Sequence, residues 1–304
     1  MKKYLILLAA LTGSIAASAQ SNSTADSLLN SMSAGNSTNQ PVAIFKSSRM
    51  VLTQSSETVK GKNLNFLVIH RFGDFASKQG GGQTYFGLDA VNDVYIGFEY
   101  GLSDNLNIDL GRSTIGGLAD LELKYALLHQ TTNGSSPLAI TLIGESGVRP
   151  YGNSFTDVSS RMSYLAQVIF ARKFCSSLSL QVVPSYVRNN TPIPVGNEQD
   201  FMALSGTARV KVSRHMGVII DYAHSFSAFA RNRADFSDPL GVGLEIETGG
   251  HVFTMNVTNA RAINEINYLS NGQNTAYGSG QYRLGFTISR MFDFNSHKKH
   301  NKEE

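Results

Sequence analysis

The 304-residue chain has no tryptophan, one cysteine and few charged residues. The lone Cys175 excludes a disulfide scaffold and a CxxC-type zinc or haem site. Charged residues make up 16% of the chain, against about 25% in ordinary soluble domains, while a hydrophobic share of 41% excludes disorder throughout. No run of 18 apolar residues follows the N-terminus, which excludes a membrane protein built from helices. A large β protein rich in glycine and tyrosine remains.

The first forty residues predict export. Lys2 and Lys3 precede an apolar run over 4–11 and then the small residues Ala17-Ser18-Ala19, the order of a secretory signal peptide. We expect residues 1–19 to be removed by cleavage between Ala19 and Gln20; the alternative is a short buried helix. Removing two lysines from 26 basic residues leaves 24 against 23 acidic ones, which gives no case for a nucleic-acid partner. Residues 20–40, rich in Ser and Asn, predict a flexible linker.

From residue 63 onward the hydrophobic pattern has period 2, which is typical of strands with two different faces. Val94, Ile96 and Phe98, for example, alternate with Tyr95 and Gly97. Twelve strands are expected, at 63–72, 93–101, 105–113, 117–130, 137–149, 158–174, 178–188, 200–213, 217–226, 239–248, 250–259 and 280–293. Uncertain strand ends leave ten or fourteen strands open. The barrel region would span 63–293, followed by a polar tail at 294–304.

Strand length and loop length favour a membrane barrel over a soluble sandwich. Most predicted strands have 9–14 residues, and a tilted strand needs about 9–11 residues to cross a bilayer. Links after even-numbered strands are short, whereas most links after odd-numbered strands are longer, as in 73–92 and 260–279; the link at 114–116 is an exception. Periplasmic turns and outer loops produce this alternation in transmembrane barrels. We therefore predict an all-β fold, a closed antiparallel barrel in the outer membrane.

Charged residues on the opposite faces of the strands would line the lumen. Twelve strands should allow a narrow pore unless it is plugged, and balanced charges predict weak ion selectivity unless they cluster. The alternative is a lumen sealed by ion pairs. The expected lumen-lining residues are eight acids and seven bases: Glu99, Asp109, Asp120, Glu122, Glu145, Asp221, Glu245, Glu247, Lys124, Arg149, Arg161, Lys173, Arg209, Lys211 and Arg283.

Residues 41–62 precede the first strand and contain Ile44, Phe45, Met50, Val51 and Leu52. This apolar content exceeds that of the linker. We expect the segment to lie across the periplasmic mouth or to plug the lumen, and in the second case gating becomes possible.

Several short blocks of the sequence together carry a family resemblance. The blocks are Phe45-Lys46 with Arg49, Ser56-Glu57-Thr58, His70-Arg71-Phe72-Gly73-Asp74, Phe86-Gly87-Leu88-Asp89, Glu99-Tyr100-Gly101-Leu102, Gly111-Arg112-Ser113, Leu123-Lys124-Tyr125, Asp238-Pro239-Leu240, Glu245-Ile246-Glu247-Thr248-Gly249-Gly250-His251-Val252-Phe253, Thr258-Asn259 and Gly285-Phe286-Thr287-Ile288-Ser289-Arg290. They resemble an uncharacterised outer-membrane β-barrel family of Bacteroidetes-type bacteria. The resemblance covers about residues 42–293 and implies an outer-membrane barrel, with no catalytic residues or ligands to transfer.

Enzyme and metal chemistry have weaker support. His224 invites comparison with barrel phospholipases, but the residue at i+2 is Phe226, so a serine would have to come from another strand. His251 and His215 lie at turns and could contribute to a metal site only with further ligands. Cys175 is expected to be a spectator.

We therefore expect a non-enzymatic barrel with no cofactor, most simply a narrow passive pore for small solutes. The alternative is a sealed structural or docking barrel whose outer loops bind a partner, and a lipid-modifying enzyme is the third hypothesis. Expected partners are outer-membrane lipid and the barrel-assembly machinery, with small solutes or a periplasmic partner as further candidates.

Overall fold

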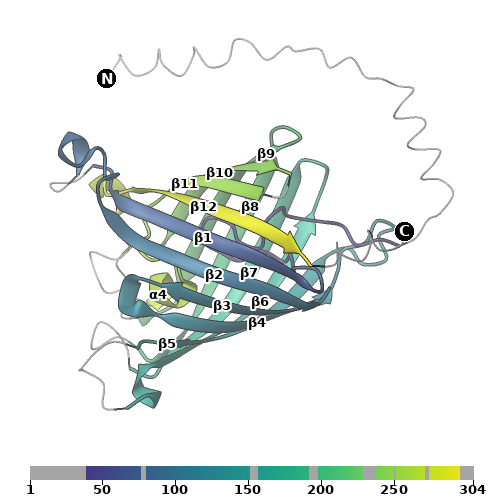
Figure 1. Ribbon diagram of the computed structural model, residues 1–304, viewed down its shortest axis with the longest axis horizontal. Helices are drawn as coiled ribbons and strands as arrows, with labels where there is room; N and C mark the ends of the chain where they lie inside the picture. Colours follow the sequence, from purple (N-terminus) through teal and green to yellow (C-terminus); the bar gives the residue numbers. More distant parts are fainter. Residues whose placement is uncertain are drawn as a thin grey trace, which may run out of the picture. The chain divides into compact units, whose positions relative to one another are not determined.

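A computed structural model describes residues 39–76, 80–150, 157–191, 198–228, 237–249, 251–270 and 274–294. Residues 41–294 within these ranges form one unit that contains a closed antiparallel barrel of twelve strands (Figure 1). The predicted fold class and strand number are confirmed. The expected signal peptide, almost all of the expected linker and the tail after residue 294 lie outside the described residues.

The twelve strands are 8–13 residues long and follow one another around the barrel. They are β1 (Asn63–Asp74), β2 (Val91–Ser103), β3 (Leu106–Ser113), β4 (Ala119–Leu128), β5 (Ala139–Val148), β6 (Met162–Lys173), β7 (Leu178–Asn189), β8 (Asp200–Lys211), β9 (Met216–Ser225), β10 (Leu240–Thr248), β11 (His251–Thr258) and β12 (Arg283–Asp293).

Pairing of β1 with β12 closes the sheet, from Asn63 opposite Asp293 to Asp74 opposite Arg283. Closure leaves no unpaired strand edge, and this is the condition that lets a β-sheet cross a bilayer without stranded backbone polar groups. None of the described helices is long and apolar enough to span a membrane.

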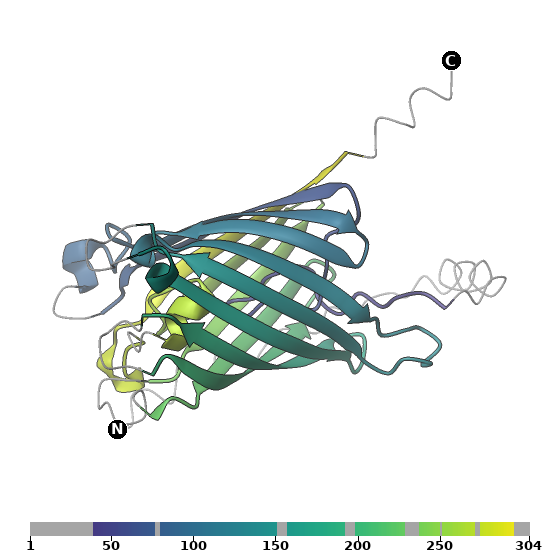
Figure 2. The ribbon, with the colours of Figure 1, turned by 90° about the horizontal axis from the view of Figure 1, so that it is seen from below.

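The barrel has two different ends (Figures 1 and 2). The first strand starts and the last strand ends at the turn end, together with the links β2–β3, β4–β5, β6–β7, β8–β9 and β10–β11. The other end, here called the loop end, carries the longer links, the short α-helix α4 (Glu265–Ser270) and the 3-10 turns η1 (Gly81–Thr84), η2 (Ile115–Gly117), η3 (Ser159–Arg161) and η4 (Tyr277–Ser279).

The outward faces of the strands are apolar. Phe98, Leu110, Leu121 and Leu204, for example, point away from the lumen and are more than 40% exposed. Soluble proteins rarely expose apolar patches larger than a few hundred Å². A continuous apolar outer face is what a membrane-spanning barrel requires, because this face meets lipid.

Most strand ends lie within two residues of the prediction, and the largest difference concerns β6. The sequence pattern predicts a strand from 158, but Ser159–Arg161 form the 3-10 turn η3 and β6 begins at Met162. Asp157 causes the difference, because its carboxylate accepts hydrogen bonds from the Ser159 hydroxyl and the Ser160 N–H. Such local side-chain bonds favour turns over strands.

Candidate functional site: a lumen filled from both ends

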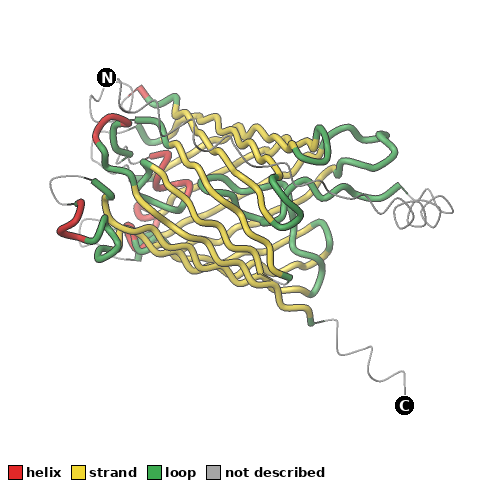
Figure 3. Tube along the Cα trace, turned by 90° about the horizontal axis from the view of Figure 1, so that it is seen from above, coloured by secondary structure: helices red, strands yellow, loops and turns green. Residues whose placement is uncertain are grey.

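Residues 41–62, here called the N-terminal segment, enter the barrel at the turn end, and the mostly buried part at 44–59 lies inside it before β1 begins (Figure 3). Within the segment a tight turn is closed by an isolated bridge between Arg49 and Gln54 and by a hydrogen bond from the Met50 N–H to the Thr53 carbonyl. Met50, Val51 and Leu52 are at most 5% exposed. The segment therefore occupies the lumen, and residues 49–54 are here called the lumen turn.

The lumen turn is bound by one carboxylate of β9. Oδ2 of Asp221 accepts hydrogen bonds from three consecutive backbone N–H groups: Val51 at 2.8 Å, Leu52 at 2.7 Å and Thr53 at 3.3 Å. Hydrogen bonds to a charged acceptor are roughly twice as strong as neutral ones. Asp221 thus fixes the lumen turn to the barrel wall.

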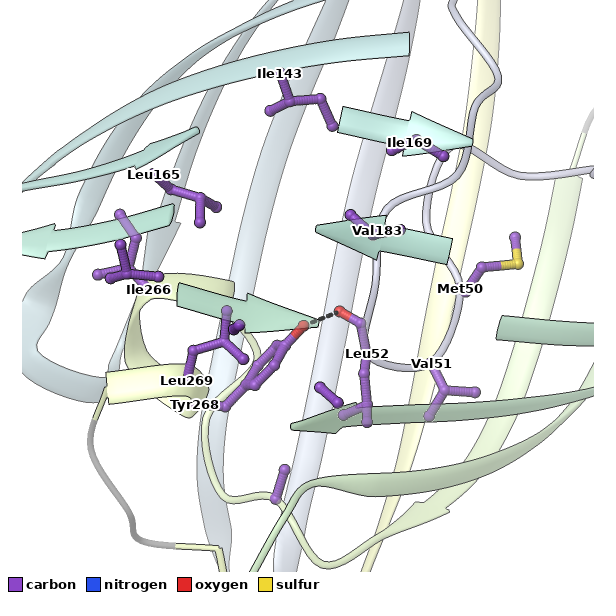
Figure 4. Packing of buried hydrophobic residues seen from close by; sticks show 14 of the residues in the cluster. Met50, Val51, Leu52, Ile143, Leu165, Ile169, Val183, Ile266, Tyr268 and Leu269 are labelled. Atoms are coloured by element: carbon purple, nitrogen blue, oxygen red, sulfur yellow. Dashed lines mark hydrogen bonds between the residues drawn. The ribbon is translucent and has the colours of Figure 1, made fainter. Parts of the chain in front are cut away.

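The link between β11 and β12 enters the lumen from the loop end and meets the lumen turn. All six residues of α4 are buried, and the Tyr268 hydroxyl donates to the Leu52 carbonyl at 3.3 Å (Figure 4). On β1, the guanidinium of Arg71 donates to the carbonyls of Ala260 and Ala262 in this link and, at 3.3 Å, to that of Val51. Arg71 therefore joins both fillings of the lumen.

Apolar side chains pack where these two fillings meet the wall. Ile266 and Leu269 of α4 belong to the same buried cluster as Val51 and Leu52, together with wall residues of β5–β9 such as Ile169 (Figure 4). On β10, Gly241 leaves room for the lumen turn: a Cβ there would lie 2.5 Å from Cγ1 of Val51. The wall is shaped to accept this turn.

The acidic side of the lumen lies on β2–β5. Gln54 donates its side-chain amide to Glu122, and the Ser48 hydroxyl donates to Oε2 of Glu99 at 2.6 Å. The Lys124 ammonium lies 3.4 Å from Oε1 of Gln54. The N-terminal segment thus supplies hydrogen-bond donors and acceptors to the charged wall. In a water-filled lumen, water would make these hydrogen bonds.

Glu265 and Arg49 are among the ionisable groups of the filling whose pKa values are shifted. Burial raises the pKa of Glu265 to about 7, although the nearby Arg49 lowers it. The pKa of Arg49 is raised because its attraction to Tyr95, Glu122 and other acids outweighs the effect of burial, which alone lowers it. Arg49 is therefore a permanent cation in the middle of the lumen.

The predicted lumen residues fall into three groups. Eleven are less than 9% exposed: Glu99, Asp109, Asp120, Glu122, Lys124, Glu145, Arg149, Arg209, Asp221, Glu245 and Arg283. Arg161, Lys173 and Glu247 are partly exposed, and Lys211 is exposed at the end of β8. These charges contact the filling and one another, as in the pair of Arg209 Nε and Glu245 Oε1 at 2.9 Å.

Three of these positions differ from the expectation of a strand face. Arg149 follows the end of β5, where its guanidinium donates to Ser163 at 2.9 Å, and Arg161 belongs to η3. Lys211 ends β8 beyond the buried stretch of the wall. In each case the strand ends earlier, or begins later, than the periodic pattern predicts.

The sequence pattern missed the residues that hold the filling in place. Arg71 is 1% exposed, and Tyr268 is 2% exposed within a link expected to be an outer loop. Two features of the sequence could have indicated a filled lumen. The apolar residues Ile263, Ile266 and Leu269 are unusual for an exposed loop. Gly241 and Gly243, two positions apart on the same strand face, indicate that another part of the chain approaches the strand closely.

The candidate enzyme and metal residues have ordinary surroundings. Nδ1 of His224 lies 2.8 Å from Oδ2 of Asp238, and the residue opposite His224 on β8 is Leu204, which offers no hydroxyl. Within the ranges that the structure describes, no three His, Cys, Asp or Glu residues are placed to hold a metal ion. Cys175 is exposed in a turn.

Comparison with known proteins places the barrel among membrane proteins. Residues 45–292 match the family model described as membrane bound beta barrel domain (DUF5777). A search of curated proteins gives no match.

Several solved structures are similar to the chain at low sequence identity. An outer membrane channel from Pseudomonas putida F1 has a TM-score of 0.50 and 12% identity, over 80% of this chain and 100% of that one. The NanC porin gives a TM-score of 0.46 and 7% identity over 75% and 98% of the two chains. The outer membrane protein Omp33 of Acinetobacter baumannii gives 0.42 and 8% over 77% and 100%.

Proposed function

Because the chain belongs to the family of membrane-bound β-barrel domains that its residues 45–292 match, we propose that it is an outer-membrane pore for small solutes, closed at rest by the N-terminal segment. The observation that carries this proposal is the lumen turn, which is held by hydrogen bonds to a wall that remains polar beneath it. A barrel whose lumen never held water would have no need of eleven buried ionisable residues around it, because burying such groups is costly.

The orientation follows from the same proposal. The turn end, where the first strand starts and the last strand ends, would face the periplasm, so the N-terminal segment would enter the lumen from that side. A periplasmic partner that pulls on the chain ahead of residue 41 would then open the pore. Assembly would require outer-membrane lipid and the barrel-assembly machinery.

Planar-bilayer conductance of the refolded protein tests the proposal. We expect the wild-type chain to be closed most of the time and a chain lacking residues 41–60 to show frequent, discrete conductance steps. Removing these residues takes away the lumen turn together with its bonds to Asp221 and Glu122. Heat-modifiable gel mobility must show that both proteins are folded. Silence of a folded deletion variant would refute the pore.

A sealed structural barrel is the second candidate, and the apolar cluster favours it. Residues from α4, the lumen turn and β5–β9 share one buried cluster, which resembles a permanent core. Such a barrel would bind partners through its loops and remain silent after the deletion. The enzyme hypothesis lacks a nucleophile: the His224 imidazole pairs with Asp238, but the residue opposite it on β8 is Leu204, which has no hydroxyl.

Opening should depend on pH through Glu265, whose Oε1 accepts the Gln54 N–H at 2.9 Å. Arg49, Glu122 and Gln167 also act on this carboxyl. In the closed state its pKa is about 7, against an ordinary value of 4.5, so the closed state binds the proton more tightly. Stabilisation of closure is therefore complete below about pH 4.5 and is lost as the pH rises through about 7.

We accordingly expect the open probability of the wild-type pore to rise at least about tenfold between pH 5 and pH 8, at fixed voltage and salt. The variant Glu265→Gln keeps an acceptor oxygen without a titrating proton, so its open probability should change much less. Equal open probability at both pH values in the wild type, or a decrease at pH 8, would contradict this assignment.

A further inference from the structure

The inner wall of β2–β5 carries four carboxyl groups in one continuous row. Glu99 lies opposite Asp109, Asp109 opposite Glu122, and Glu122 opposite Glu145. All four side chains are at most 6% exposed. Like charges directly opposite each other destabilise a sheet. A row of this kind therefore requires protons on some of its carboxyl groups, or a cation or hydrogen-bond donors in front of it.

The chain supplies that cation from the lumen turn. The guanidinium carbon of Arg49 lies 4.8 Å from the centre of the Tyr95 ring, and Nη2 is 3.4 Å from the Tyr95 hydroxyl oxygen. That hydroxyl in turn donates to Oδ2 of Asp120 at 2.9 Å. An aromatic face with carboxylates around it is a favourable site for an organic cation.

Arg49 fills this site incompletely. The side chain is 5% exposed, yet its Nε has no hydrogen-bond partner among the described residues. Among the described residues, no carboxylate forms an ion pair with Arg49 within 4.0 Å. The guanidinium is thus held by the face of the Tyr95 ring and by surrounding charge, and not by a bidentate pair with a carboxylate. A separate ligand that is free of the chain has room to make the hydrogen bonds that Arg49 does not make.

The wall around this site has more carboxyl groups than basic side chains. Six carboxyl groups surround the Arg49 side chain or continue the row: Glu99, Asp109, Asp120, Glu122, Glu145 and Glu265. Lys124 is the basic residue that the wall places beside the row. Opposite it on β3, the fully buried amide of Asn107 has neither its oxygen nor its nitrogen paired with a described residue. Withdrawal of the N-terminal segment would leave these groups to a solute.

We propose that the pocket formed by Tyr95, Asp120 and Glu122 is a binding site for a small organic cation with a flat, guanidinium-like head, and that Arg49 occupies it in the closed pore. This inference rests on the proposed function, because a solute reaches the pocket only when the N-terminal segment leaves. A guanidinium suits the pocket better than an ammonium, since it stacks on aromatic rings and is weakly hydrated. The N-terminal segment would then compete with the solute for one site.

The first test is chemical rescue in the full-length chain. Arg49→Ala leaves a guanidinium-sized space in the closed lumen. The variant is refolded with 10 mM ethylguanidinium chloride, at roughly the site dissociation constant expected for so small a ligand, or with KCl at equal ionic strength. We expect ethylguanidinium, and not KCl, to raise the temperature at which heat-modifiable mobility is lost, with a half-maximal effect on the order of millimolar.

Arg172→Ala is the matched control. Arg172 also stacks on an aromatic ring, with its guanidinium carbon 5.1 Å from the Phe174 centre, but on the exposed surface and away from the carboxyl row. Its variant should show no effect of ethylguanidinium. An equal rise in this control, in KCl, or in an Arg49→Ala,Glu122→Gln double variant would overturn the proposal, and so would the absence of any rise.

A second measurement keeps the proposal testable if Arg49→Ala does not refold, and it separates the site from the pore. Ethylguanidinium at millimolar concentration should block current through a chain lacking residues 41–60, and Glu122→Gln in that chain should weaken block about tenfold or more. Current without block or rescue would leave the pore standing and remove the cation site. Rescue in a barrel that never conducts would support the site and remove the pore.

Discussion

Replacing Asp221 by alanine should open the pore, with the open-to-closed ratio rising about a hundredfold. Asp221 accepts three N–H bonds from the lumen turn, at 2.7, 2.8 and 3.3 Å. Hydrogen bonds to charged groups contribute about 1.5–3 kcal/mol each. The cost of burying the carboxylate offsets part of this sum, so a net loss of about 3 kcal/mol is expected, and 1.4 kcal/mol changes an equilibrium tenfold.

The measurement is single-channel open probability of the full-length chain at fixed voltage. Asp221→Asn is the matched variant, because its amide oxygen still accepts backbone N–H bonds at similar geometry, and it should open much less than Asp221→Ala. If Asp221→Ala folds and stays as closed as the wild type, the lumen turn is not held by this carboxylate in the way that the distances indicate.

Adding one methyl group at Gly241 should also unseat the lumen turn. A Cβ at this position would lie 2.5 Å from Cγ1 and 3.3 Å from Cβ of Val51, and 3.4 Å from Cγ of Leu52. These three contacts are all with the lumen turn, so the added methyl group should destabilise the closed state and not the barrel itself. Overpacking of this kind typically costs 1–3 kcal/mol. We expect open probability to rise about five- to a hundredfold in Gly241→Ala.

A second substitution should reverse this effect. In the double variant Gly241→Ala,Val51→Ala the smaller side chain on the lumen turn makes room for the methyl group added on β10. The open probability should therefore fall back toward the wild-type value. Gly144→Ala is the control, because a Cβ there would meet no atom within 4 Å. A double variant as open as Gly241→Ala alone would show that the contact with Val51 is not what the methyl group disturbs.

The sequence alone determined the barrel. Alternation with period 2 and strand length are local properties that do not depend on strand register. For this reason twelve strands were predicted, and the described residues form twelve. The alternation of short and long links is also a local property that can be read from the order of strands along the chain. Errors appear where a local turn competes with the period, as at η3, where Asp157 turns the chain and removes Arg161 from the strand.

Only the tertiary structure decided how the lumen is filled. Val51 and Asp221 are 170 residues apart in the chain, and no periodic pattern links a segment before the first strand to a carboxylate on the ninth. The carboxyl row likewise depends on the register of four strands, which a one-residue slip would abolish. Composition predicted balanced charge, whereas folding gathers acids on β2–β5 and sets Arg49 against them, because charge position depends on which strands are neighbours.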